Sequence, residues 1–233
     1  MNTIAISIIV LLIGAVLGYI VRRLVEAHER TNREKRIAYV FVVGLTPAFA
    51  WKTIVDSLLV TAKTQPEYPK ELAEKSGEKV AFATYFVNSI KTEERNQPAL
   101  QRIAQSCREN IARMQLTAEQ KVLLPESTIL NYAIFEHSLN TFEHYLLEVL
   151  LCEPTEASDV ANLIDSTYSL CEDAEKLRTE MAIYGKISSV DLKKIDSRVL
   201  SPIAVGFFKQ LSNYEALEAL EQIDSTSDSS DST

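Results

Sequence analysis

The residues best suited to chemistry lie in a doubled motif, FEHSLNTFEH at residues 135–144, in which an acid stands beside a histidine twice. Such side chains can bind a transition metal or transfer protons. Two histidines that share one ion on a helix usually stand four residues apart, whereas His137 and His144 are seven apart. That spacing is about 10 Å along a helix, too far for one zinc ion with Zn–N bonds of about 2 Å. The motif therefore does not predict a metal site.

A packing seam explains the repeat better. Apolar residues recur at alternating steps of three and four, the a/d pattern of a heptad helix, at Tyr132, Phe135, Leu139, Phe142, Leu146 and Val149. On this helix His137 and His144 occupy the position farthest from the seam, so we predict that both face solvent and that His144 forms a surface contact with Glu148. Should this seam pair with a second copy of the same helix, the chain would form a coiled-coil homodimer through Tyr132–Val149.

Other catalytic signatures are missing from the sequence. It has no GxxxxGK[ST] phosphate loop, no GxGxxG, no GxSxG elbow and no HExxH, and its six glycines are scattered. The third histidine, His28, lies in a basic stretch rather than near an acid and a nucleophile. We predict a protein that is not an enzyme, with no catalytic, cofactor-binding or metal-binding residues; a metal-dependent helical enzyme is the least favoured alternative.

The three cysteines, Cys107, Cys152 and Cys171, are odd in number and far apart, which is not the pattern of a disulfide framework. Cys107 and Cys171 fall on apolar stripes with helical spacing. We therefore predict that both are buried structural thiols.

The chain begins with a membrane-spanning pattern. Ile4–Val21 is an uncharged stretch that spans about 27 Å as a helix, close to the thickness of the bilayer core. A cleaved signal peptide would carry its basic residues before this stretch, but here Arg22 and Arg23 follow it. We predict that residues 1–21 are a single-pass transmembrane anchor in the lipid bilayer, with the N-terminus outside and the remaining domain cytoplasmic. Gly14 and Gly18 form a GxxxG pair that suggests a homodimer through the anchor.

Two segments follow the anchor. Residues 22–36 are a basic juxtamembrane segment. Residues 37–62 begin with a second apolar run, Ile37–Trp51, which is short for a span and contains Gly44 and Pro47. We interpret it as a membrane-proximal helix buried in a core or against the membrane. The alternative is a second span, which would place the rest of the chain outside.

Residues 70–223 have the helical period throughout, and few glycines or prolines, so the fold class is all-α and we expect a bundle of five or six helices. The prolines of QPEYP predict a break at 65–69, TAEQ at 117–120 predicts a capping box, and Pro125 predicts a helix start. The expected helices are residues 71–90, one following Gln97, one from Pro125 to about 152, one ending at Tyr184 before Gly185, and 189–223. The Ser/Asp tail, residues 224–233, is predicted to be disordered.

The charge distribution excludes one class of partner. The net charge is -8, but residues 1–36 carry six basic and three acidic groups, which leaves 18 basic and 29 acidic in the rest. An acidic domain repels the phosphate backbone, so we predict no nucleic-acid binding. The expected function is a non-catalytic helical interaction or scaffold protein, or an accessory subunit of a membrane complex, that binds an unidentified protein. The alternative is a two-span subunit of a transport or secretion assembly.

Overall fold

The computed structural model describes residues 2–91, 97–152 and 155–196, and for residues 2–18, 20, 90 and 99 it describes the course of the helix only. Every regular element in these ranges is helical, which confirms the all-α prediction. The elements are α1 (Asn2–Ala62), α2 (Lys70–Ser76), α3 (Glu78–Tyr85), the π-helix η1 (Phe86–Lys91), α4 (Gln97–Met114), α5 (Ala118–Lys121), α6 (Glu126–Leu151) and α7 (Ala157–Gly185). A further helical stretch covers residues 189–196; the rest of the predicted last helix, and the predicted tail 224–233, lie outside the described residues.

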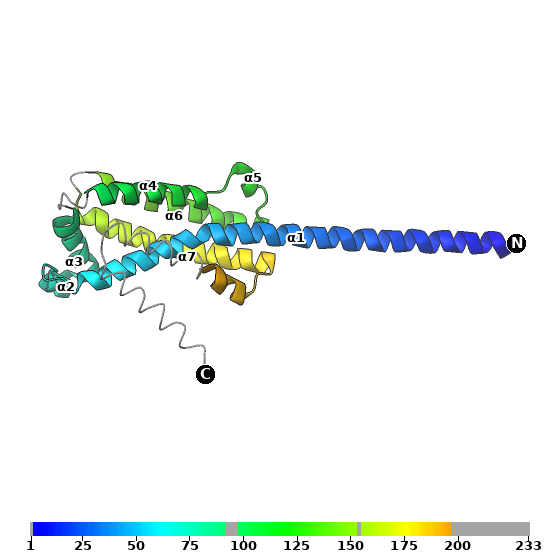
Figure 1. Cartoon of the computed structure of the whole chain (residues 1–233), viewed down its shortest axis with the longest axis horizontal. Helices are drawn as coiled ribbons and strands as arrows, with labels where there is room; N and C mark the ends of the chain where they lie inside the picture. The colour runs from blue at the N-terminus through cyan, green and yellow to red at the C-terminus, as the bar shows by residue number, and fades with distance from the viewer. Residues whose placement is uncertain (1, 92–96, 153–154, 197–233) are drawn as a thin grey trace, which may run out of the picture.

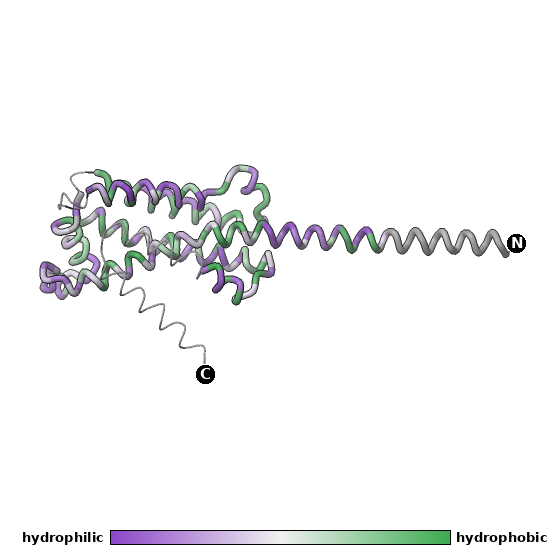
Figure 2. Tube along the Cα trace, viewed as in Figure 1, coloured by the Kyte–Doolittle hydropathy of each residue, from purple (hydrophilic) through white to green (hydrophobic). Residues whose placement is uncertain are grey.

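The helix α1 dominates the shape of the molecule. Its 61 residues run without a break through Pro47 and extend for about 92 Å. One half lies within the bundle, and the other projects from one end of it (Figure 1). We call residues 22–36 the stalk: they are exposed, apart from a half-buried Glu34, and Figure 2 shows that hydrophilic residues predominate where the stalk leaves the bundle. The predicted anchor and basic segment are thus parts of one helix.

The second apolar run is a central helix of the bundle. It contributes Ala38, Phe41, Val42, Leu45, Ala48, Trp51 and Ile54 to the main core, each 5% exposed or less. This half of α1 packs mainly along α7, and also against α4. The predicted bundle boundary at residue 70 was therefore too late, because the bundle begins near Ile37. No turn separates this run from the stalk, so the helical hairpin required for a second span is not formed.

The α6 seam lies in the same core, except for Val149, which belongs to a second, smaller core. Tyr132, Phe135, Leu139, Phe142, Leu146 and Val149 are all 5% exposed or less, and they are covered by elements of the same chain. The predicted burial of Cys107 is confirmed, because it lies on a buried apolar stripe of α4 with Leu100, Ile103, Ile111 and Met114. Because the α6 seam is occupied within one chain, a homodimer through Tyr132–Val149 would have to open the bundle, and we withdraw it.

The ends of the elements follow most of the sequence signals. The backbone N–H of Thr117 donates to Gln120 Oε1 (2.9 Å), and Gln120 N–H donates to Thr117 Oγ1 (3.3 Å), which is the predicted capping box. The break at QPEYP separates α1 from α2, and α6 begins directly after Pro125. The single helix predicted for 71–90 was wrong. Gly77 has a φ of 92°, a left-handed conformation that favours glycine, and it divides this segment into α2 and α3.

Candidate functional site

The doubled motif lies on the outer side of α6. His137 and His144 are exposed, as predicted, while Phe135 and Phe142 are completely buried. The imidazole Nε2 of His144 lies 3.3 Å from Glu148 Oε2, and the two side chains remain 67% and 41% exposed. Within the described ranges no group of three or more His, Cys, Asp and Glu side chains is arranged to hold a metal ion. The structure therefore brings no further ligand to these histidines.

The first glutamate of the motif has a structural partner. Lys121 Nζ lies 2.6 Å from Glu136 Oε1 and 5.4 Å from the ring centre of Tyr132. The hydrogen bond with Glu136 raises the pKa of Lys121. Burial raises the pKa of Tyr132, whose hydroxyl accepts a hydrogen bond from the N–H of Leu116 (3.1 Å). These contacts hold the α5 loop against α6.

A polar cluster that the sequence analysis missed joins α1 to α7. The hydroxyl of Tyr168 donates to Asp56 Oδ1 (2.6 Å), and Lys52 Nζ contacts Asp56 Oδ2 (2.8 Å). Burial, and then the hydrogen bond with Asp56, raises the pKa of Tyr168 to about 12. A tyrosine with a raised pKa keeps its proton at neutral pH and acts here as a hydrogen-bond donor. Residues 56 and 168 are 112 positions apart, so their pairing leaves no local signal in the sequence.

The three thiols differ in their environment. Cys107 is 1% exposed, and burial raises its pKa strongly, as expected of a structural thiol. Cys171 is only half-buried, which corrects the prediction of full burial; burial is still the main cause of its raised pKa. Cys152 is exposed at the end of α6.

A buried lysine binds the C-terminal end of α6. Lys91 is 5% exposed and donates to the carbonyl oxygens of Val149 and Cys152, the latter at 2.7 Å, and to Thr155 Oγ1 at 2.6 Å. A cation at the end of a helix where the carbonyls lack partners is favourable. The ammonium group of Lys91 donates to two backbone carbonyls and one side-chain hydroxyl, so its position indicates a structural role.

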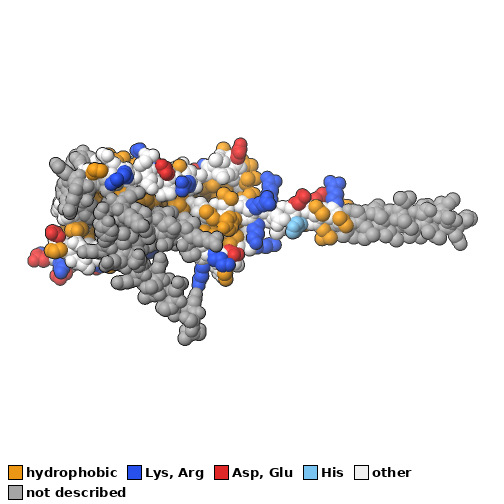
Figure 3. Space-filling model, in the orientation of Figure 1, with side chains coloured by type: hydrophobic (Ala, Val, Ile, Leu, Met, Phe, Trp, Pro, Cys, Tyr) orange, Lys and Arg blue, Asp and Glu red, His pale blue; other side chains and the backbone are white. Residues whose placement is uncertain are grey.

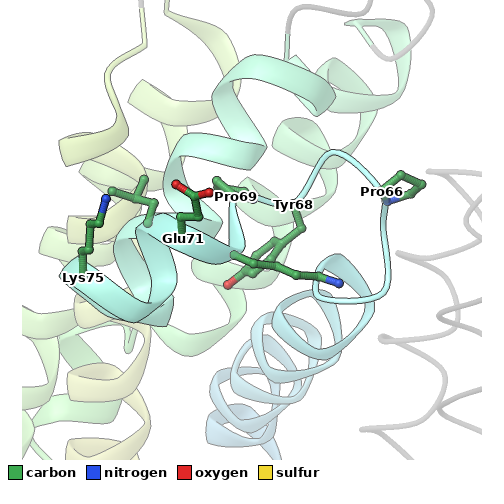
Figure 4. A pocket seen from close by; sticks show the side chains of 7 residues that line it. Pro66, Tyr68, Pro69, Glu71 and Lys75 are labelled. Carbon is green, nitrogen blue, oxygen red and sulfur yellow. The ribbon is translucent and has the colours of Figure 1, made fainter.

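A pocket lies where α1 turns into α2 (Figure 4), at the end of the bundle away from the stalk (Figure 1). Its volume is about 550 Å³, and its lining residues are Pro66, Tyr68, Pro69, Lys70, Glu71, Leu72 and Lys75. Tyr68 is 6% exposed, and burial raises its pKa. Figure 4 shows Tyr68 between Pro66 and Glu71, and the hydroxyl of Tyr68 donates to the backbone carbonyl oxygen of Glu78 (3.4 Å). The lining residues include one carboxylate and no histidine, cysteine or serine, so they offer no pairing of such a nucleophile with a base.

Exposed apolar side chains gather at the other end of the bundle, where the stalk leaves it. We call this group the end surface; it consists of Tyr39, Val40, Val122, Ile129, Leu130, Ile134, Ile183 and Val190, which are between 44% and 84% exposed. These residues come from α1, the loop after α5, the first turns of α6, the last turn of α7 and the helix at 189–196. Figure 3 shows orange side chains at this end, beside the blue cluster of the stalk.

Three contacts hold the elements of the end surface together. Asn131 Nδ2 donates to Glu180 Oε1 (2.5 Å), which fixes the start of α6 beside the end of α7. Arg178, 7% exposed, donates to both carboxylate oxygens of Asp196 (2.8 and 2.9 Å) and so holds the helix at 189–196. A Cβ placed on Gly185 would lie 2.2 Å from that of Ala38, so α7 and α1 touch here. Large apolar patches that remain exposed commonly mark interaction sites.

The hydropathy of α1 must be interpreted with its burial. Within the residues whose side chains are described, one helical stretch, Val21–Ala62, is long and apolar enough to cross a membrane, but 56% of its most apolar part is buried in the bundle. That apolar part belongs to the core half of α1, which follows the predicted anchor, Ile4–Val21. Comparisons with protein families, with curated proteins and with solved structures found no match for the chain.

Proposed function

We propose that the chain is a single-pass membrane protein that binds a partner protein through its helical bundle and has no catalytic activity of its own. The supporting observation is the continuity of α1, which joins the uncharged N-terminal stretch to the bundle core as one helix. A helix of this kind carries the bundle at a fixed distance from the membrane. In this proposal the N-terminus is outside and the bundle is in the cytoplasm, because Arg22, Arg23 and the other cations of the stalk follow the span.

The end surface is the proposed binding site for the partner. It lies on the side of the bundle nearest the proposed membrane span, so the partner is a protein embedded in, or held close to, the same membrane. The alternative of a two-span transport or secretion subunit loses its support, because its second span would remove Phe41, Leu45 and Trp51 from the core.

Membrane attachment is tested by extraction of the membrane fraction with alkaline carbonate. The wild-type chain should remain in the pellet. Replacing Val10 and Leu11 together by arginine should release it, because each arginine at the centre of a span costs about 2.5–3.5 kcal/mol on the insertion scale. Leu24→Arg, which adds a charge to the stalk at a position already 65% exposed, is the control and should stay in the pellet. Wild-type protein in the supernatant would overturn the proposal.

Partner binding is tested by purification from a mild detergent extract. A protein recovered with the wild type should be lost from Leu130→Glu and from Ile183→Glu, which charge the end surface. It should remain with Val60→Glu, because Val60 is also well exposed (60%, against 70% for Leu130 and 74% for Ile183) but lies near the opposite end of the bundle. Circular dichroism checks that each variant is folded. Equal recovery with all variants would show that the end surface is not the binding site.

A further inference from the structure

One face of α1 carries no Asp, Glu, Lys or Arg from Val21 to Asn32, although the stalk as a whole is strongly charged. Val21, Val25, His28 and Asn32 follow one another at steps of four, three and four, the spacing of a heptad seam. All four are exposed, Val21 and Val25 by 58% and 51%. The helix continues from Asn2, so Gly14 and Gly18 extend the same register into the proposed span. The seam thus covers about 27 Å of α1.

Four charged residues of the stalk form two ion pairs on a different side of the helix. Arg22 Nε lies 2.8 Å from Glu26 Oε1, and Arg30 Nε lies 2.9 Å from Glu34 Oε1. In each of these i,i+4 pairs the two opposite charges belong to the same helix, so neither needs a partner from another chain. The seam has no Asp, Glu, Lys or Arg between Gly14 and Asn32, and Lys35, next to the bundle, is the next residue in the same register.

The bundle also leaves this face open. Where α1 enters the core, Ala38, Phe41 and Leu45 point towards the bundle, and their mean direction lies roughly a third of a turn from the seam at about 100° per residue. Tyr39 continues the seam and is 48% exposed. A second helix along the seam would therefore not collide with the bundle of its own chain.

We propose that the seam binds the seam of a second copy of this chain, in a parallel pair of α1 helices that extends from Gly14 to Asn32. The inference rests on the proposed membrane attachment, which supplies the reason for this occupant: two copies inserted with the same orientation present the same face at the same depth. Small residues at Gly14 and Gly18 allow close approach within the lipid. Outside it, Val21 and Val25 pack against their counterparts, and Asn32 meets Asn32, a seam residue that favours a defined register in two-stranded coils. Lys35 marks the end of the pairing because like charges would face each other there.

Disulfide cross-linking in native membranes tests the pair. In a background with Cys152→Ser and Cys171→Ser, single cysteines are placed on the seam (Val25→Cys, Asn32→Cys) and away from it (Arg23→Cys, Arg30→Cys). Mild oxidation should convert most of the seam variants, and at least fivefold less of the controls, to a dimer on a non-reducing gel. No dimer from the seam variants, or equal yields at all four positions, would overturn the proposal.

A second measurement addresses the membrane half of the seam. Gly14→Leu together with Gly18→Leu should reduce the cross-linking yield of Val25→Cys severalfold, whereas Ala5→Leu, on the opposite side of the helix, should not. An unchanged yield with the glycine variants would overturn pairing within the bilayer. All yields are measured on protein in the membrane fraction: protein found only in the soluble fraction would overturn the membrane attachment and this inference together, whereas membrane-bound protein without the seam pattern would overturn the pairing alone.

Discussion

Gly185 lies at the point where α7 comes closest to α1. A Cβ at this position would stand 2.2 Å from the Cβ of Ala38, a distance that real side chains do not reach. Gly185→Ala should therefore lower the free energy of unfolding by about 1–3 kcal/mol, the usual cost of overpacking a core. Denaturant unfolding followed by circular dichroism measures the change.

Two further variants separate this contact from a general effect of removing glycine. Gly44→Ala places a Cβ 3.5 Å from the carbonyl oxygen of Arg113 in α4, which is an ordinary van der Waals distance. Because alanine favours the helix over glycine, this variant should leave stability unchanged or raise it by up to about 1 kcal/mol. Adding Ala38→Gly to Gly185→Ala should recover part of the loss. If the double variant is as unstable as the sum of its single changes, the close approach is not the cause.

Lys91 is the second residue whose loss should be costly. Lys91→Met keeps the length and apolar character of the side chain but removes the ammonium group that binds the end of α6. Buried polar groups that lose a partner cost about 1–3 kcal/mol, so the unfolding free energy should fall by this amount. Lys121→Met, which breaks one partly exposed ion pair with Glu136, is the control and should change the midpoint of unfolding little. Equal effects would indicate that Lys91 is not a cap.

Features of single residues could be predicted from the sequence when they depended on neighbours close by in the chain. The exposure of His137 and His144 followed from the period of one helix, and the capping box from four consecutive residues. Lys91 with Thr155 and Asp56 with Tyr168 were not foreseen, because each pair is brought together only by the packing of distant helices. Cys171 was placed correctly on an apolar stripe, but its distance from the centre of the core was not evident from that stripe.

At the scale of elements, α1 shows why a boundary was misplaced. The sequence changes from uncharged to basic and then to apolar within residues 4–51, which suggested three segments. Changes of composition along a helix alter its surroundings and need not interrupt its backbone hydrogen bonds. The first two breaks in the chain are a proline cluster, 66–69, which follows α1, and a glycine at a left-handed φ, Gly77, which follows α2. Pro47 alone did not.

The placement of α1 in the core predicts which parts of the chain fold alone. Its buried side chains include Phe41, Val42, Leu45, Trp51 and Ile54, and each contributes about 1.5–3 kcal/mol on burial. Their sum is comparable with the whole stability of a typical domain, 5–15 kcal/mol. A chain comprising residues 33–233 should unfold cooperatively in a thermal melt, whereas a chain comprising residues 70–233 should not.

Near-ultraviolet circular dichroism gives the same comparison without heating, because it reports fixed aromatic packing. Trp51 of α1 and Phe142 of α6 pack together in the main core, with ring centres 5.7 Å apart. The spectrum of residues 33–233 should show fixed aromatic packing. A well-packed, cooperative domain formed by residues 70–233 alone would show that α1 is dispensable and that the core has been assigned wrongly.

At the scale of the whole molecule, the stalk sets the distance between the bundle and the proposed membrane span. Its fifteen residues, 22–36, correspond to about 22 Å of straight helix. The end surface lies at the bundle end of this interval, and the pocket at the turn from α1 to α2 lies at the far end of the bundle. A partner bound to the end surface would therefore fill the space between the bundle and the bilayer.

The orientation of the molecule can be tested with its own exposed thiol. Cys152 lies at the end of α6 away from the stalk, and in a Cys171→Ser variant the other remaining thiol, Cys107, is buried. If the bundle is cytoplasmic, a membrane-impermeant maleimide should label Cys152 only after the cells are permeabilised. Asn2→Cys, combined with Cys152→Ser and Cys171→Ser, should be labelled in intact cells because it lies before the span. Labelling of Cys152 in intact cells would place the bundle outside. In that case the arginines after Val21 would not have determined the orientation. The partner would then have to be sought on the outer side of the membrane.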